Sequence, residues 1–396
     1  MPFDFNIYSS LLLPPFIQGV FFALLLFYRG WTADRLSDKL LGWLLLLNAV
    51  RIAYWMLGFA GWYDTHDDFT SFMFYFPFNN VIWMGPLLYF YFLSLTNTDF
   101  RFSKRHRKHL LLPAGWLTLM IIKFVVDFSL NRPFPVIEET QYGTKGPLAD
   151  LEKNAWFDLA ALLSFAYYLF ITLKAFRTYQ SYVKQNFSST DEIRFDWLRN
   201  LLYTISAGVL VFFLFELVGL LNNGITYKFQ WYAYLGLGIV IYYLSIAGYF
   251  TYPRSLQRLH FEPAKESAPK VTNEDIIEAK PELDKWKQRL LEHMERGKPY
   301  LEPELSLADL AKRLNTNTSV LSKVINDGTG RNFNDFINSY RVQEVIQKLK
   351  QGEQKTQTLL GIAYDCGFNS KATFNRSFKK VTEKTPKEFI ESLTTG

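Results

Sequence analysis

The stretch Leu359–Pro386, LLGIAYDCGFNSKATFNRSFKKVTEKTP, carries the most informative pattern in the chain. It opens with apolar residues at helical spacing, Gly367 follows as a turn residue, and Ser370 is a suitable N-cap for a second helix. Phe374 and Phe378 stand at i and i+4 and are expected to face inward. Two short helices joined by a tight turn form a helix-turn-helix unit, whose second helix enters the DNA major groove.

The same pattern occurs a second time, upstream. Ser306 is a suitable N-cap, an apolar stripe at i, i+3, i+4 and i+7 starts at Leu307, and a second helix starts at Thr318. Leu321 and Phe374 occupy matching places 53 residues apart. A longer amphipathic helix lies between the two units and would hold them at a fixed separation, since major-groove faces on one side of B-DNA lie about 34 Å apart.

These residues together resemble the AraC/XylS-type DNA-binding domain. The resemblance covers about the last 110 residues and is strongest in GFNSKATFNRSFKK, Gly367–Lys380, and in the closing TPKEF, Thr385–Phe389. It implies a two-unit helix-turn-helix fold, sequence-specific binding of double-stranded promoter DNA and control of transcription; a contact with RNA polymerase is also expected. The family's cupin-like sugar-binding domain is absent from this chain, so the resemblance implies no ligand.

Candidate DNA contacts lie on the exposed N-terminal part of each second helix, where side chains meet base edges. Arg or Lys can bond guanine, Asn can bond adenine, and Thr can touch a thymine methyl group. The predicted set is Thr318, Ser319, Ser322 and Lys323 in the first unit, and Lys371, Ala372, Thr373, Asn375 and Arg376 in the second. Lys379 and Lys380 are better placed to bind phosphates than to read bases.

The N-terminal part of the chain has the composition of a membrane protein. Of the 70 aromatic residues, 59 lie in the first 252 residues. A spanning helix needs about 20 mostly apolar residues. Seven segments qualify: Leu11–Tyr28, Leu40–Ala60, Phe72–Leu95, Leu110–Leu130, Ala155–Phe176, Leu198–Leu221 and Phe229–Phe250. The expected fold class is therefore all-α, a seven-transmembrane helix bundle followed by a cytoplasmic double helix-turn-helix domain.

The charges of the loops predict the orientation of this bundle. Fifteen Lys and Arg residues lie in or at the edges of the loops after the first, third, fifth and seventh segments, against four on the other side. The positive-inside rule then places the N-terminus outside and the C-terminus in the cytoplasm, as for a multi-pass protein of the bacterial inner membrane. The basic run Arg101–Lys108 is interpreted as a cytoplasmic loop near anionic lipid headgroups of the bilayer.

Three domains are predicted. Residues 1–252 form the transmembrane sensor domain, residues 253–284 a linker with four prolines, and residues 285–396 the DNA-binding domain, with its units at 306–326 and 359–381. Two alternatives stay open for promoter access: DNA recruited to the membrane, or release of the domain by cleavage in the linker. The oligomeric state also stays open between a monomer and a homodimer paired through the helix around Trp286.

Charged and strongly polar residues within the apolar segments mark a candidate signal site, because such residues are costly in a bilayer. Arg51, Asn79, Asn80 and Glu216 are predicted at similar depth and are expected to line one polar cavity that opens outward. Arg51 and Glu216 would pair when the cavity is empty. Two interpretations remain: a polar contact that stabilises the bundle, or a pocket for a small polar or amphipathic signal that competes for the pair.

Few signs of enzymatic chemistry occur. One cysteine, Cys366, excludes a disulfide framework and a multi-cysteine metal site, and no metal or cofactor is expected. No phosphate-binding glycine loop or nucleophile motif is found, so no catalytic residue is predicted. The favoured function is a membrane-embedded one-component transcription regulator that responds to a small-molecule or envelope signal. The alternative is a membrane transporter or enzyme with a regulatory DNA-binding domain.

Overall fold

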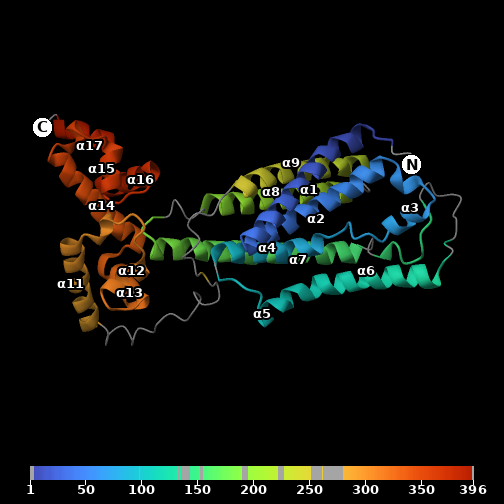
Figure 1. The fold of residues 1–396 in the computed structure, drawn as a ribbon, viewed down its shortest axis with the longest axis horizontal. Coiled ribbons are helices and arrows are strands. Elements are labelled where there is room, and N and C mark those ends of the chain that lie inside the picture. Colours follow the sequence, from blue (N-terminus) through green and yellow to red (C-terminus); the bar gives the residue numbers. More distant parts are fainter. Residues whose placement is uncertain are drawn as a thin grey trace. The chain divides into compact units, whose positions relative to one another are not determined.

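The computed structural model describes residues 4–97, 99–132, 134, 143–151, 155–189, 195–221, 227–250, 261 and 280–394. No β-strand occurs in this part of the chain, which confirms the all-α prediction (Figure 1). The chain divides into two compact units. The first holds the described residues of Met1–Ala175 and Asp196–Tyr252, and the second those of Phe176–Phe195 and Phe261–Gly396.

The first unit is built from helices, most of which are apolar (Figure 1). Its elements are α1 (Ile7–Thr32), α2 (Leu36–Phe59), η1 (Trp62–Asp64), α3 (Asp68–Met73), α4 (Val81–Thr96), α5 (Lys104–Arg107), η2 (Lys108–Leu110), α6 (Leu111–Leu130), α8 (Phe195–Leu221) and α9 (Tyr227–Phe250). Helix α7 (Ala155–Asn186) begins in this unit, and its residues from Phe176 onward belong to the second.

Helix α1 packs between α2 and α9. A Cβ atom added at Gly19 would lie 3.1 Å from Cβ of Ala49 on α2 and 3.2 Å from Cγ2 of Ile241 on α9, so a side chain here would push these neighbours apart by a few tenths of an ångström. Small residues at helix contacts are typical of membrane bundles, where packing replaces the hydrophobic effect. On the outer face of α1, Ile17 and Phe21 are more than half exposed. An outer face of this kind suits lipid better than water.

Five helices among the described residues are long and apolar enough to cross a bilayer: α1, α2, the segment Lys104–Leu130 that contains α6, α7 and α9. The predicted count of seven is therefore not confirmed. Helix α4 is apolar but has 16 residues, about 24 Å at 1.5 Å per residue, against a hydrocarbon core of about 30 Å.

The third predicted segment, Phe72–Leu95, is wrong as a continuous helix. Helix α3 ends at Met73, and helical structure resumes only at Val81. Pro77 lies in the break, and proline removes a helix donor and disfavours helical backbone at the preceding residue. The helical segment is thus completely interrupted around Pro77.

The second unit contains nine helical elements among the described residues (Figure 1). They are α11 (Lys280–Gly297), η5 (Pro299–Leu301), α12 (Leu307–Arg313), α13 (Thr318–Thr329), α14 (Phe333–Lys350), η6 (Glu353–Lys355), α15 (Leu359–Asp365), α16 (Lys371–Thr382) and α17 (Pro386–Thr394). The end of α7 also belongs to this unit.

Two hydrophobic cores stabilise the second unit, and α14 contributes to both. Phe336 of α14 lies in the first core with residues of α12 and α13, while Val345 lies in the second with residues of α15 and α16. One rigid helix therefore fixes the two helix-turn-helix units relative to each other, as the sequence predicted.

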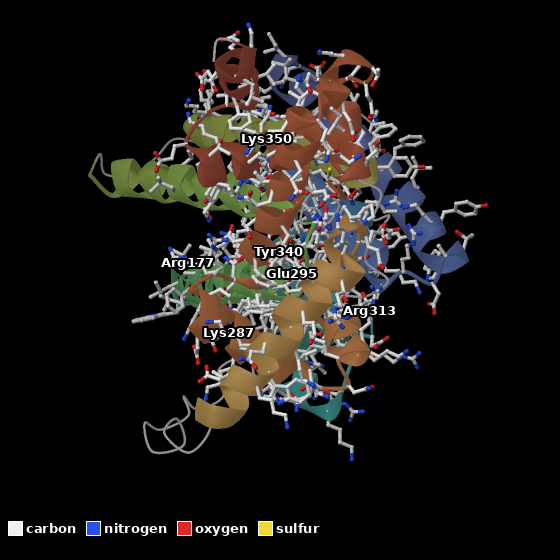
Figure 2. All side chains as sticks on the ribbon, turned by 90° about the vertical axis from the view of Figure 1, so that its left-hand side faces the viewer. Arg177, Lys287, Glu295, Arg313, Tyr340 and Lys350 are labelled. Carbon is white, nitrogen blue, oxygen red and sulfur yellow. The ribbon has the colours of Figure 1, made fainter. Side chains whose placement is uncertain are left out.

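Helix α11 starts at Lys280, so the last residues of the predicted linker 253–284 are helical. Leu290 and Met294 of α11 are fully buried in the first core, and Trp286 packs against it. Figure 2 shows α11 crossing the face of the unit, with Glu295 beside Tyr340 of α14. Burial raises the pKa of the Tyr340 hydroxyl, and Glu295 adds to this effect. The apolar face of α11 is thus packed within its own chain.

Candidate nucleic-acid interface

Side-chain caps fix where the helices of both units begin. Ser306 forms a capping box with Asp309 at the start of α12, and Ser370 Oγ accepts a hydrogen bond from the Thr373 amide at 3.2 Å at the start of α16. Asn317 Oδ1 likewise accepts from the Val320 amide at the start of α13, at 2.8 Å. The predicted N-caps Ser306 and Ser370 are confirmed.

Helix α16 has one buried and one exposed face. Phe374 and Phe378 are buried in the second core. On the opposite side, four of the predicted base-contact residues are exposed: Lys371, Ala372, Asn375 and Arg376. The Arg376 guanidinium donates a hydrogen bond to Thr373 Oγ1 at 3.2 Å, which orients it on this face. A guanidinium held in this way can make the bidentate bonds that recognise guanine.

Thr373 is a correction to the predicted set. Its side chain is 3% exposed, so it is not available to a base edge. The prediction took every residue in the first turns of α16 as exposed, but the residue just before Phe374 turns inward with it. Thr373 instead positions Arg376 from within the protein.

Helix α13 presents a smaller exposed face. Leu321, Val324 and Ile325 are buried, as predicted. Thr318 and Ser319 are exposed, whereas Ser322 and Lys323 are partly buried. Ser322 Oγ accepts a hydrogen bond from Asn326 Nδ2 at 3.3 Å. The most accessible predicted contacts of this unit therefore lie in the first turn of α13.

The two lysines predicted to bind phosphate differ in their surroundings. Lys380 Nζ lies 2.7 Å from Asp335 Oδ2 of α14, an exposed ion pair that competes with a phosphate for the ammonium group. Lys379 is exposed on the same helix. Lys379 is thus the better placed of the two for a DNA backbone contact.

The predicted signal residues make separate contacts in the first unit. Arg51 lies over the ring of Tyr234, 5.8 Å from its centroid. Asn80 is buried and donates to the Leu47 carbonyl of α2 at 3.0 Å, and its Oδ1 has no hydrogen-bond partner among the described residues. Asn79 instead donates to Asp158 of α7 at 3.0 Å. Glu216 lies in α8, but its side chain falls outside the described residues.

The sequence analysis missed two buried charged residues, Lys123 and Asp127, in α6. Asp127 accepts hydrogen bonds from the Tyr75 hydroxyl at 2.6 Å and the Leu148 amide at 2.9 Å. Lys123 Nζ donates to the Ala149 carbonyl at 3.0 Å. The sequence itself marks these two residues, because two charged residues at i and i+4 within an apolar segment are as unusual as the single charge of Arg51. These bonds hold residues 146–149 against α6.

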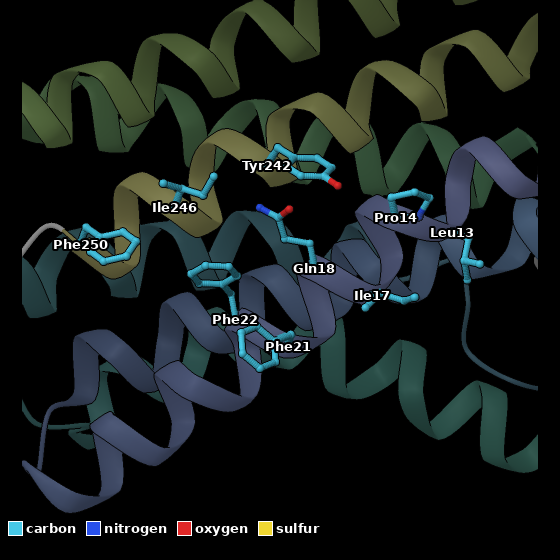
Figure 3. Close-up of a pocket in the computed structure, with 9 residues that line it drawn as sticks. All are labelled: Leu13, Pro14, Ile17, Gln18, Phe21, Phe22, Tyr242, Ile246 and Phe250. Carbon is cyan, nitrogen blue, oxygen red and sulfur yellow. The ribbon is translucent and has the colours of Figure 1, made fainter.

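A shallow apolar groove of about 660 Å³ runs between α1 and α9 (Figure 3). Gln18, one of the residues that line it, donates from Nε2 to Ser245 Oγ at 2.9 Å. None of the predicted signal residues lines this groove. Its open surface is largely apolar.

Comparison with known proteins agrees with this geometry. Residues 310–392 match the model of a helix-turn-helix domain family. An uncharacterized HTH-type transcriptional regulator of Staphylococcus aureus is 32% identical over 90 residues, which are 23% of this chain and 12% of that protein. The TCP pilus virulence regulatory protein of Vibrio cholerae is 36% identical over 87 residues, 22% of this chain and 30% of that protein.

The chain thus covers less than a third of the length of either relative. No solved structure matches it significantly. The similarity confirms that the C-terminal region is a helix-turn-helix domain of the AraC/XylS type, and it does not extend to the apolar helices.

Proposed function

We propose that this protein is a membrane-embedded one-component transcription regulator, in which the apolar helices respond to a signal and the C-terminal unit binds promoter DNA. The observation that carries the proposal is the pair of exposed faces on α13 and α16, joined by the single helix α14. Both relatives are named as regulators, one of transcription and one of pilus virulence functions.

Two observations support membrane embedding with a cytoplasmic C-terminus. Residues such as Ile17 and Ile239 expose more than half of their apolar side chains, which water would penalise and lipid would not. The segment after α7 belongs to the same unit as the DNA-binding helices, so both lie on one side of a membrane. Three basic residues within Phe176–Phe195, Arg177, Lys184 and Arg194, support the cytoplasmic side.

The main test is DNA binding by the full chain in nanodiscs. Fragments from upstream of its own gene should bind, and the affinity should fall with salt, because phosphate contacts release counterions. Absence of binding to any such fragment, at low salt, would refute the regulator function and favour a transporter or enzyme.

Arg376→Ala is expected to weaken binding to the cognate site by about 1–3 kcal/mol and to relax preference at one base position. The reason is the loss of a base contact from an exposed, oriented guanidinium. Affinities for a panel of single-base variants of the site measure this effect. Equal weakening on every sequence would show that Arg376 contacts phosphate and not a base.

Lys379→Ala is expected to weaken binding to all sequences alike and to reduce the slope of log K against log salt by about one unit. Lys380→Ala is the matched control on the same helix, and its effect should be smaller because Asp335 already pairs with it. Titrations at three salt concentrations measure both. If Lys380→Ala reduced the salt slope more than Lys379→Ala does, Lys380 and not Lys379 would be the residue that contacts the phosphate.

Arg51, Asn79, Asn80 and Glu216 remain the proposed signal-responsive groups. If they only stabilise the bundle, Arg51→Leu should lower the amount of protein, and Arg51→Leu with Glu216→Leu should restore both the amount and normal reporter induction. If they form a pocket, the double variant should accumulate normally but stay in one reporter state. Immunoblots beside a promoter-reporter assay separate the two results.

A further inference from the structure

The short segment that follows α7, Phe187–Ser189, is built into the DNA-binding unit; we call it the α7 tail. Ser188 is fully buried. Its amide donates to the Leu305 carbonyl at 3.2 Å, and its carbonyl accepts from Asn334 Nδ2 at 2.8 Å. Its hydroxyl oxygen accepts from the Arg341 guanidinium at 3.1 Å. Asn334 and Arg341 both lie on α14, the helix that joins the two helix-turn-helix units.

Arg341 makes the α7 tail part of a larger network. Its side chain is 1% exposed, and burial lowers the pKa of its guanidinium. A buried guanidinium is tolerated only when its N–H groups find acceptors. Arg341 donates to the carbonyls of Tyr300 at 2.7 Å and Glu302 at 2.6 Å, in the loop that leads into α12, and to Ser188. Ser188 therefore completes the bonding of the residue that ties this loop to α14.

The last turns of α7 add an apolar contact to the same unit. Phe261 is 1% exposed, and its ring lies 5.3 Å from that of Tyr179 and 5.4 Å from that of Tyr182. Phe187 also forms an isolated antiparallel bridge with Ser306, the N-cap of α12. The tail is thus held by backbone and side-chain hydrogen bonds, and the turns of α7 before it are held by the aromatic contact with Phe261.

The α7 tail leaves the proposed DNA face free. Its polar partners lie in residues 303–306 and on α14, and none of them is a predicted base contact. The docked arrangement is therefore compatible with DNA binding, with Thr318, Asn375 and Arg376 still exposed.

We propose that the α7 tail is the docking element through which the membrane helices control the DNA-binding unit, a proposal that rests on the proposed regulator function. Helix α7 starts at Ala155, and in its first turn Asp158 accepts the hydrogen bond from Asn79, one of the proposed signal-responsive groups. A displacement of α7 acts on Ser188, and through Arg341 on the loop that positions α12 and α13. The docked tail supports DNA binding, and its release weakens it.

Disulfide trapping tests the contact without any DNA. Residues paired across an antiparallel bridge have Cα atoms about 4.5–5.5 Å apart, which suits a disulfide. In the full chain in nanodiscs, Phe187→Cys with Ser306→Cys should form a disulfide under mild oxidation. The control pair, Ser181→Cys with Ser306→Cys, should not, because Ser181 lies six residues earlier on α7. Native Cys366 does not interfere, since it is buried and burial raises the pKa of its thiol to about 12.

DNA affinity of the same full-chain proteins tests the control function. Ser188→Ala removes one of the acceptors of the buried Arg341 guanidinium and should weaken promoter binding about five- to tenfold. Ser339→Ala is the matched control: Ser339 is also a buried serine, on α14 itself, but its hydroxyl donates to the Phe336 carbonyl of its own helix. That variant should bind like the unmodified chain.

Each outcome decides between the alternatives. Equal trapping of the two cysteine pairs would overturn the docking contact. Trapping of the expected pair, with Ser188→Ala and Ser339→Ala binding DNA equally, would overturn the control function. Stronger DNA binding after Ser188→Ala would mean that the docked tail inhibits DNA binding, the opposite of the proposal. A disulfide in a chain that binds no promoter fragment would refute the proposed regulator function, and the control function with it, but would leave the contact established.

Discussion

Phe378→Ala is expected to destabilise the second helix-turn-helix unit by about 3–5 kcal/mol, the range for removing a phenylalanine side chain from a packed core. Phe378 is fully buried, and its ring contacts those of Phe374 at 5.6 Å and Phe389 at 5.4 Å. The side chain thus connects α16 to α17 as well as to the rest of the second core. Hydrogen exchange of residues 359–394 in the full chain measures the change.

Tyr364→Ala is the matched control for this substitution. Tyr364 is an aromatic residue of the same unit, but its side chain is 46% exposed. Surface substitutions usually change stability by no more than about 0.5 kcal/mol. If the amides of residues 359–394 exchanged hydrogen at equal rates in the two variants, α16 would not be held by the second core as the structure shows. Loss of DNA binding by Phe378→Ala would then have to be read as loss of a contact and not of the fold.

Gly367→Ala is expected to cost about 2–4 kcal/mol, because two separate penalties combine at this turn between α15 and α16. The backbone of Gly367 has φ of +90°, which residues with a Cβ atom rarely adopt. A Cβ atom would also lie 2.6 Å from the Tyr300 carbonyl oxygen and 2.8 Å from that of Leu301. Both neighbours are backbone atoms, so neither can move aside as a flexible side chain would.

Gly352→Ala separates the two penalties. Gly352 has φ of +85°, but a Cβ atom there would meet nothing within 4 Å. Gly352→Ala should therefore reduce the stability of the unit only by the conformational penalty, about 1–2 kcal/mol. Hydrogen exchange of the α16 amides in each variant provides the comparison. Equal losses would mean that the turn at Gly367 has room for a side chain, which contradicts its close approach to the loop at Tyr300.

Most of the DNA-binding unit could be predicted from the sequence because its determinants are local. Ser306 and Ser370 cap helices through bonds to residues three positions away, and Phe374 and Phe378 share a face because helical periodicity places them there. The repeated spacing of 53 residues then predicted two similar units. The apolar segments likewise predicted an all-α N-terminal part through composition alone.

In the DNA-binding unit, the sequence alone determined where the caps Ser306 and Ser370 lie and which face of α13 and α16 is apolar, because these depend on neighbours within one or two turns. The tertiary structure alone decided that Thr373 is buried, that the chain breaks between Met73 and Val81, and that Ser188 completes the bonding of Arg341. Ser188 and Arg341 are 153 residues apart. No periodicity or local preference links such positions, and only the folded chain brings a buried donor and its acceptor together.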